Sequence, residues 1–179
     1  MMYRSAHQHN GFSLIELMVV IAVLAALAVG VLPQIYRNIN KGKTSAVEKF
    51  YGAVKNAAVA YFSDNKVWPA TSATGADFMV DPGGSISATW DGPYLDRWQV
   101  ADPWGGTYAW YSLSSGANFN LSLAGERYIS ITSVPLADAQ RLDRFIDITL
   151  NASSGWVRYI PVGSAYTVNI LVSRDGEVN

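Results

Sequence analysis

The spacing of apolar residues divides the chain into an apolar amino-terminal run, an amphipathic stretch and a mixed carboxy-terminal part. The run from Phe12 to Leu32 carries a single charge, that of Glu16. A helix of about 21 residues rises about 1.5 Å per residue and spans roughly 30 Å, which is the thickness of a bilayer core. The pattern therefore predicts that the chain enters a membrane at least once.

The amphipathic stretch lies between Thr44 and Phe62, where apolar residues recur three and four positions apart. This spacing is typical of one face of an α-helix. The residues of this face are Val47, Phe50, Val54, Ala57, Ala58 and Tyr61. Gly30, Pro33 and Gly42 weaken the helix between the two halves. We predict one long helix from about Ser13 to Phe62, with a kink at Pro33.

The carboxy-terminal part consists of short segments separated by turns. Residues 65–102 are rich in Gly, Pro, Ser, Thr and Asp, which predicts a connection dominated by loops. Residues 135–145 begin with a proline and predict a short helix. The β-rich segments predict strands, the first three as an antiparallel meander, at 107–113, 118–123, 127–132, 146–150, 156–160 and 166–173. The expected fold class is α+β, with an antiparallel sheet packed on the amphipathic half of the long helix.

Composition excludes most catalytic chemistry. The chain has no cysteine, and its two histidines, His7 and His9, both lie among the first ten residues. If that segment is removed, a Ser-His-Asp triad, a Cys-His pair and a histidine-ligated metal site are all impossible. The formal net charge of -1 gives no basic surplus, so no nucleic-acid partner is predicted. We expect a protein that is not an enzyme; a membrane-tethered carbohydrate-binding or carboxylate-based hydrolytic protein is the alternative.

The junction before the apolar run is unusual for a secretory signal. Such a signal would have its small-residue cleavage site after the apolar run, but here the run passes into Pro33 and a polar segment. The polar residues 1–11 instead end in Gly11, which has no side chain and lets a protease approach the backbone closely. A carboxylate such as that of Glu16 costs about 2.5–3.5 kcal/mol at a bilayer centre and is usually functional.

Residues 11–21, GFSLIELMVVI, closely resemble the class III signal of type IV prepilins. The resemblance implies that a prepilin peptidase cuts between Gly11 and Phe12 and then methylates the new amino group of Phe12. It also implies a cleaved leader at 1–11, a helix at 12–62 that serves as membrane anchor and filament core, and a globular head at 63–179. Glu16 and Pro33 correspond to the glutamate and the helix-kinking proline of that family.

Cleavage would create a partner for Glu16. The amine of Phe12, either its own or that of a neighbouring subunit, is the expected cation, and a subunit that neutralises its neighbour's buried charge gains both register and affinity. The alternative is that Glu16 reaches the lipid headgroups and pairs with nothing.

A second resemblance lies in residues 92–95 (GPYL) and 102–108 (DPWGGTY), which look like the loop of the major, G-type pseudopilins of type II secretion. From the residues alone, DPWG predicts a turn at Asp102, Pro103, Trp104 and Gly105: Asp starts it, Pro fixes φ and Gly permits the return.

Major pseudopilins commonly hold calcium in an acidic loop after this turn. Here residues 111–127 contain Glu126 and no aspartate, whereas calcium prefers several oxygen ligands. We therefore predict no metal and no cofactor. Calcium stays as an alternative, with a different candidate ligand set in Asp81, Asp91, Asp96 and Asp102.

Five aromatic residues cluster along the sequence and invite a sugar-binding hypothesis: Trp90, Tyr94, Trp98, Trp104 and Trp110. Aromatic side chains serve equally well in a core or as anchors at a subunit interface. A small domain without cysteines needs such core residues, so we favour the core and interface interpretation.

Two functions share one mechanism. The chain is either a structural subunit of a type IV pilus or a pseudopilin of a type II secretion piston. Both are made in the bacterial inner membrane and enter a filament of identical copies, either an extracellular pilus or a periplasmic pseudopilus. The implied partners are the prepilin peptidase and an inner-membrane assembly platform with its ATPase. The DPWG turn favours the pseudopilin. The missing acidic loop and the extra carboxy-terminal strands favour the pilin, which is the interpretation we adopt.

Overall fold

The computed structural model describes residues 12–113, 125–147 and 150–174. The chain divides into two compact units, residues 1–40 and residues 41–179. One helix, α1 (Leu14–Asn65), begins in the first unit and ends in the second. It is long and apolar enough to cross a membrane, and its most apolar 18-residue window has no buried residue.

Helix α1 confirms the long helix expected from the sequence, although it extends to Asn65 rather than to about Phe62. Pro33 lies inside it, and the kink assigned to this residue stays a prediction. The buried residues of α1 are Thr44 and all six members of the predicted apolar face. The three-and-four spacing therefore identified the face of α1 that packs on the sheet.

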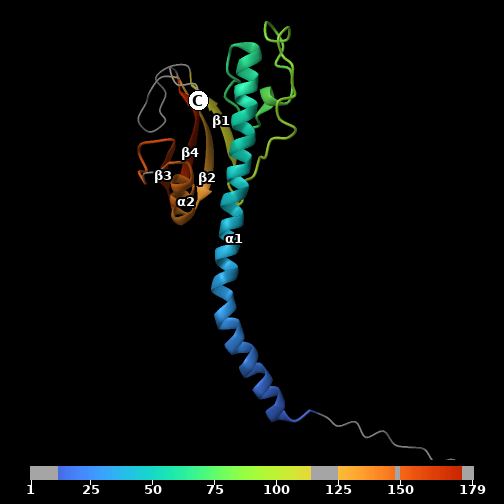
Figure 1. Ribbon diagram of the computed structural model, residues 1–179, viewed down its shortest axis with the longest axis vertical. Coiled ribbons are helices and arrows are strands. Elements are labelled where there is room, and N and C mark those ends of the chain that lie inside the picture. The colour runs from blue at the N-terminus through green and yellow to red at the C-terminus, as the bar shows by residue number, and fades with distance from the viewer. Residues whose placement is uncertain (1–11, 114–124, 148–149, 175–179) are drawn as a thin grey trace, which may run out of the picture. The chain divides into compact units, whose positions relative to one another are not determined.

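The second unit contains a four-stranded antiparallel sheet with the strand order β1–β2–β4–β3 (Figure 1). Its strands are β1 (Tyr108–Ser112), β2 (Glu126–Val134), β3 (Val157–Val162) and β4 (Ala165–Arg174). Helix α2 (Leu136–Ile146) lies between β2 and β3 in the sequence, which confirms the helix predicted after Val134. The long connection from α1 to β1 contains only one 3-10 turn, η1 (Ala76–Phe78).

The predicted meander is wrong. Strands β1 and β2 are direct antiparallel neighbours, with Tyr108 opposite Ile131, so no strand can lie between them. The segment 118–123, expected as the middle strand, lies outside the described residues. Strand pairing depends on contacts between distant segments, and the local pattern of alternation does not reveal it.

The structure also contradicts the strand predicted at 146–150, in the part of this segment that it describes. Ile146 is the last residue of α2 and Asp147 is its C-cap, while residues 148–149 lie outside the described residues. Ala139 and Leu142 are buried, and Ile146 packs against the same core. These core positions recur three and four residues apart, as on one face of a helix. The segment therefore stays helical through Ile146 despite its β-rich composition.

Aromatic rings fill the core between α1 and the sheet. The ring centroid of Phe50 in α1 lies 5.2 Å from that of Trp98 and 4.5 Å from that of Tyr108. The rings of Phe78 and Trp110 meet edge to face with centroids 5.3 Å apart. Trp98 and Trp110 are buried, which confirms the core role predicted for these two members of the aromatic cluster.

An ion triad joins β2, β3 and β4. Glu126 is fully buried, and its Oε1 lies 3.3 Å from Nη2 of Arg158 and 3.1 Å from Nη2 of Arg174. Removing one partner of a buried pair typically costs about 3–5 kcal/mol, because the remaining charge is left poorly compensated. Glu126 is therefore engaged within the sheet and not free to act as a loop ligand.

Asp143 of α2 is a buried carboxyl group. Its Oδ2 accepts a hydrogen bond of 3.2 Å from the amide of Asn151, whereas its Oδ1 has no partner among the described residues. Desolvation by burial raises the pKa of Asp143 to about 6; nearby Asp147 also raises it and Arg144 lowers it. The native state therefore holds this proton more tightly than the unfolded chain does.

This pKa predicts a pH-dependent cost of folding. Because the pKa is raised above its unfolded value, the stability contributed by Asp143 is highest below about pH 4 and is lost as the pH rises to about 6. Asp143→Asn should raise the free energy of unfolding of the detergent-solubilised chain at pH 7.5, by roughly 1 kcal/mol or more, and by less at pH 5. Denaturant titration of both proteins measures this difference. The exposed Asp64→Asn is the control, and an equal effect of Asp143→Asn at both pH values would contradict the assignment.

Candidate processing and assembly site

The amino end of α1 is held by a pair of reciprocal hydrogen bonds. The backbone amide of Ser13 donates to Oε2 of Glu16 at 3.0 Å, and the amide of Glu16 donates to Oγ of Ser13 at 3.2 Å. This arrangement is a capping box, which satisfies two of the amides that a helix otherwise leaves unpaired at its start. The carboxylate also lies in the first turn, where the helix dipole favours negative charge.

Sequence reasoning assigned Glu16 a role in charge pairing alone and missed the cap. The signal was present, because a serine followed three residues later by a glutamate before an apolar run is the signature of a capping box. The cap is compatible with charge pairing. Only Oε2 of Glu16 accepts the hydrogen bond from Ser13, so Oε1 can still accept one from an amine.

The surface around this cap is apolar. Phe12 is 82% exposed, and Leu14 and Ile15 are similarly open. A shallow hollow of about 340 Å³ is lined by Phe12, Ile15, Glu16, Val19 and Val20. Among the described residues, Glu16 is the only charged one that lines this hollow, so a cation that enters it meets a carboxylate in apolar surroundings.

The structure describes only part of the predicted processing site. Gly11 and the rest of the leader lie outside the described residues, so cleavage after Gly11 and methylation of Phe12 stay predictions. Phe12 directly precedes the capping Ser13, and Glu16 follows one turn later. Phe12 and Glu16 thus lie at one end of α1, whereas Pro33 lies farther along the same helix.

The turn predicted at DPWG is confirmed. Oδ1 of Asp102 accepts hydrogen bonds from the amides of Trp104, at 2.7 Å, and Gly106, at 3.0 Å. Gly105 has a φ of 90°, a conformation that other residues rarely adopt. A Cβ atom at Gly106 would collide with the carbonyl oxygen of Thr132, so the turn approaches β2 too closely for any side chain there.

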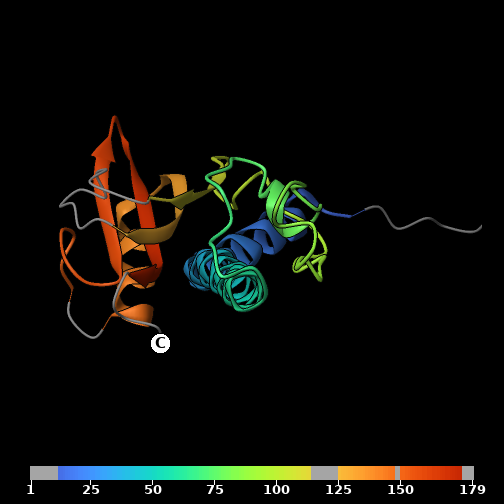
Figure 2. The same ribbon diagram turned by 90° about the horizontal axis from the view of Figure 1, so that it is seen from above.

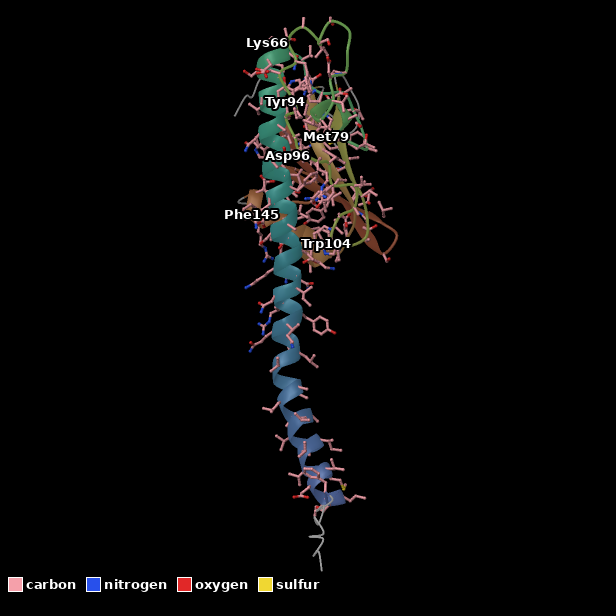
Figure 3. The ribbon with its side chains drawn as sticks, turned by 90° about the vertical axis from the view of Figure 1, so that its right-hand side faces the viewer. Lys66, Met79, Tyr94, Asp96, Trp104 and Phe145 are labelled. Carbon is pink, nitrogen blue, oxygen red and sulfur yellow. The ribbon has the colours of Figure 1, made fainter. Side chains whose placement is uncertain are left out.

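Trp104 fastens this turn to α2. Its indole Nε1 donates to Oδ2 of Asp138 at 2.9 Å, and Oδ1 of Asp138 accepts from Nη1 of Arg141 at 2.8 Å. Asp138 is buried, and these two charge-assisted hydrogen bonds offset the loss of its hydration. Trp104, labelled in Figure 3, therefore has a structural role at the joint between the long connection and α2.

The described residues do not assemble the alternative calcium site. Among them, no group of three or more Asp, Glu, His or Cys side chains is placed to hold a metal ion. Asp81 instead accepts hydrogen bonds from the hydroxyl of Ser87 and the amide of Gly83, and Asp102 organises its own turn. The four aspartates therefore do not form a metal site within the described residues.

Comparison with known protein families gives two matches along the chain. The model of the prokaryotic N-terminal methylation motif matches residues 7–32, which include the capped end of α1. The model described as PilW, C-terminal, matches residues 38–120. No solved structure matches the chain significantly.

Several characterised proteins are similar in sequence. Type II secretion system core protein G of Pseudomonas aeruginosa is 32% identical over 121 residues, which cover 66% of this chain and 84% of that protein. The core protein G of Escherichia coli K12 is 30% identical over 126 residues, covering 68% and 85%. The fimbrial protein EcpC of Eikenella corrodens is 36% identical over 87 residues, covering 49% of this chain and about half (51%) of that protein.

Two variants separate the cap of α1 from the charge of Glu16. Ser13→Ala removes the cap and keeps the charge, so it should destabilise the first turn by about 1 kcal/mol. Glu16→Gln removes the charge and keeps an oxygen acceptor for the Ser13 amide, so the first turn should stay formed. Hydrogen exchange of the first-turn amides in detergent micelles measures both effects. Equal protection in Ser13→Ala and the unaltered chain would show that the box does not hold the helix end.

Proposed function

Because the chain belongs to the family of type IV pilins and type II secretion pseudopilins, we propose that it is the structural subunit of a type IV pilus. It is made as an inner-membrane precursor, cut between Gly11 and Phe12, and assembled with copies of itself. One observation carries the proposal: an apolar helix half with a capped carboxylate at its start has no covering among the described residues. Lipid covers such a surface before assembly, and neighbouring helices cover it afterwards.

Burial of the apolar helix supplies the cohesion of the filament. Apolar surface removed from water contributes about 25 cal/mol per Å², and the side chains of residues 14–32 are exposed in the described chain. Outside the bilayer, other copies of the same helix offer the matching apolar surface. The subunits therefore stay together without covalent links, which suits a chain that has no cysteine.

Glu16 supplies the register. In an apolar bundle an unpaired carboxylate costs several kcal/mol, so helices that place a cation beside Glu16 are favoured over shifted arrangements. The cation is the amine that cleavage creates on Phe12, either in the same chain or in a neighbouring copy. Oε1 of Glu16 accepts this amine, while Oε2 remains on the Ser13 amide.

Processing and extraction require partners. We assign cleavage and methylation to the prepilin peptidase. Extraction of the helix from lipid needs work, which we assign to an inner-membrane platform and its separate ATPase, because the sequence has no P-loop pattern. The chain itself is proposed to have no catalytic activity.

A substitution at the cleavage site tests the proposal. Gly11→Leu places a bulky side chain at the scissile bond, so the precursor should keep its leader and form no filaments, as read by mass spectrometry of the native-host protein and by electron microscopy. Glu16→Gln is the matched control and should be cleaved normally but assembled poorly. Mature filaments built from Gly11→Leu chains, or a functional protein that retains its initial Met1, would contradict the proposal.

The secretion pseudopilus is the second candidate, because relatives named core protein G resemble the chain over 84% and 85% of their own length. A deletion strain distinguishes the two settings. For a pilus, deletion should remove long surface fibres, visible in sheared material by electron microscopy, and leave exported enzymes at normal levels in the medium. Unchanged surface fibres together with retention of those enzymes in the periplasm would favour the pseudopilus.

A further inference from the structure

A basic segment of α1, residues 35–43, directly follows the apolar half of the helix. It contains three cations, Arg37, Lys41 and Lys43, and no acidic residue. Residues 17–47 also contain no aspartate or glutamate, so no nearby carboxylate in the sequence offsets this charge. The basic segment therefore concentrates positive charge in a chain whose formal net charge is -1.

The three cations have no carboxylate partner among the described residues. The ion pairs found there involve other arginines, Arg141, Arg158 and Arg174. The Nε of Arg37 donates to the carbonyl oxygen of Pro33 at 3.4 Å, and the two terminal nitrogens of its guanidinium group remain available as donors. The basic segment can therefore bind an external anion without breaking an internal ion pair.

The head domain packs on α1 only beyond the basic segment. The first buried residue of α1 is Thr44. Figure 2 shows α2 and the sheet on one side of the later part of α1 and the connection of residues 66–107 on the other. In contrast, residues 35–39 are all exposed, as are Lys41 and Gly42. The side chains of the basic segment are thus accessible to a partner outside the chain.

The basic segment has an apolar side and a charged side. Ile35 and Ile39 lie four residues apart, with Tyr36 next to them on the helix surface, and all three are exposed. Arg37 and Lys41 are also four residues apart and lie on the other side of the helix. A helix with an exposed apolar side and a basic side suits the boundary between lipid and water.

The length of α1 places the basic segment at such a boundary. Tyr36 lies 20 residues after Glu16, and this distance along a helix is about 30 Å, the thickness of a bilayer core. If Glu16 lies at one boundary of the core, Tyr36 lies at the opposite one. Tyrosine is enriched at this depth, and Arg37 begins the part of the helix that meets the headgroups.

We propose that the basic segment of the membrane-inserted chain binds the headgroups of anionic phospholipids. Arg37, Lys41 and Lys43 contact the phosphates, and Tyr36 lies where the acyl chains end. The inference rests on the proposed function, in which the head is exported and the basic segment meets the outer surface of the inner membrane. The contact fixes the depth of the subunit in the membrane before assembly.

Charge selects the class of lipid. The headgroup of phosphatidylcholine carries its own cation beside the phosphate, whereas phosphatidylglycerol has a phosphate with no internal counter-charge. Three cations without carboxylate partners among the described residues therefore favour phosphatidylglycerol. Because the contact is electrostatic and lies at the membrane surface, it should weaken as the salt concentration rises.

Short-range fluorescence quenching in bilayers tests this preference. The full-length chain has no cysteine, so Leu32→Cys introduces a single thiol for a fluorophore at the end of the apolar run. The labelled chain is placed in phosphatidylcholine bilayers that contain a quencher on the acyl chain of either phosphatidylglycerol or phosphatidylcholine. At equal amounts of quencher, the phosphatidylglycerol form should associate roughly fivefold more strongly.

Two variants of equal charge show whether the basic segment causes the preference. Replacing Arg37, Lys41 and Lys43 together by glutamine should abolish it. The matched control replaces three cations of the second unit, Lys55, Lys66 and Arg97, by glutamine and should retain it. Arg37→Lys alone keeps the charge and should also retain most of the preference, which separates loss of charge from a disturbed helix.

The outcomes separate this inference from the function on which it rests. A preference for phosphatidylglycerol that the triple variant of the basic segment loses and the control keeps supports the lipid contact. Equal quenching by the two lipids, or a preference that survives in the triple variant, overturns the contact and leaves the pilus function standing. Absence of filaments from the native host would instead contradict the proposed function, whatever the lipid preference.

Discussion

The structure depends on one constraint: the first half of α1 is apolar on all sides and cannot remain in water. Within the described chain this segment has no buried residue, so its covering must come from outside. In the function proposed above, a bilayer provides that covering for a single chain, and other copies of the helix provide it in a filament. In that proposal, the same surface serves first as an anchor and then as the cohesive core of the filament.

The capping box resolves a conflict that this constraint creates. A carboxylate at the start of an apolar helix has a high cost of desolvation, yet the helix start also has unpaired amides that require acceptors. Ser13 and Glu16 satisfy each other, so the charge is partly compensated while the subunit is alone. In the proposed filament, the remaining oxygen of Glu16 still gains from a cation, and this favours assembly.

The sequence correctly predicted the features that depend on local periodicity. It identified the buried face of α1 residue by residue, because the three-and-four spacing reports directly which side of a helix is covered. It failed where contacts join distant segments. The direct pairing of β1 with β2 and the triad of Glu126 with Arg158 and Arg174 both depend on strand order. The sequence also contains the serine-to-glutamate spacing of a capping box at Ser13. This cap was missed because Glu16 was interpreted only as a partner of the Phe12 amine.

The head domain is held together without disulfides. Its core relies on aromatic rings, and its outlying elements are tied by polar joints such as Trp104 with Asp138. The ring contacts of Phe50 with Trp98 and Tyr108 lie on the buried face of α1. Burial of the apolar first half of α1 is strongly favourable but has little directional preference, because the hydrophobic effect depends on the apolar area buried and not on orientation. In the proposed filament, the charge of Glu16 is directional where apolar burial is not, so cohesion and register come from different groups on the same helix.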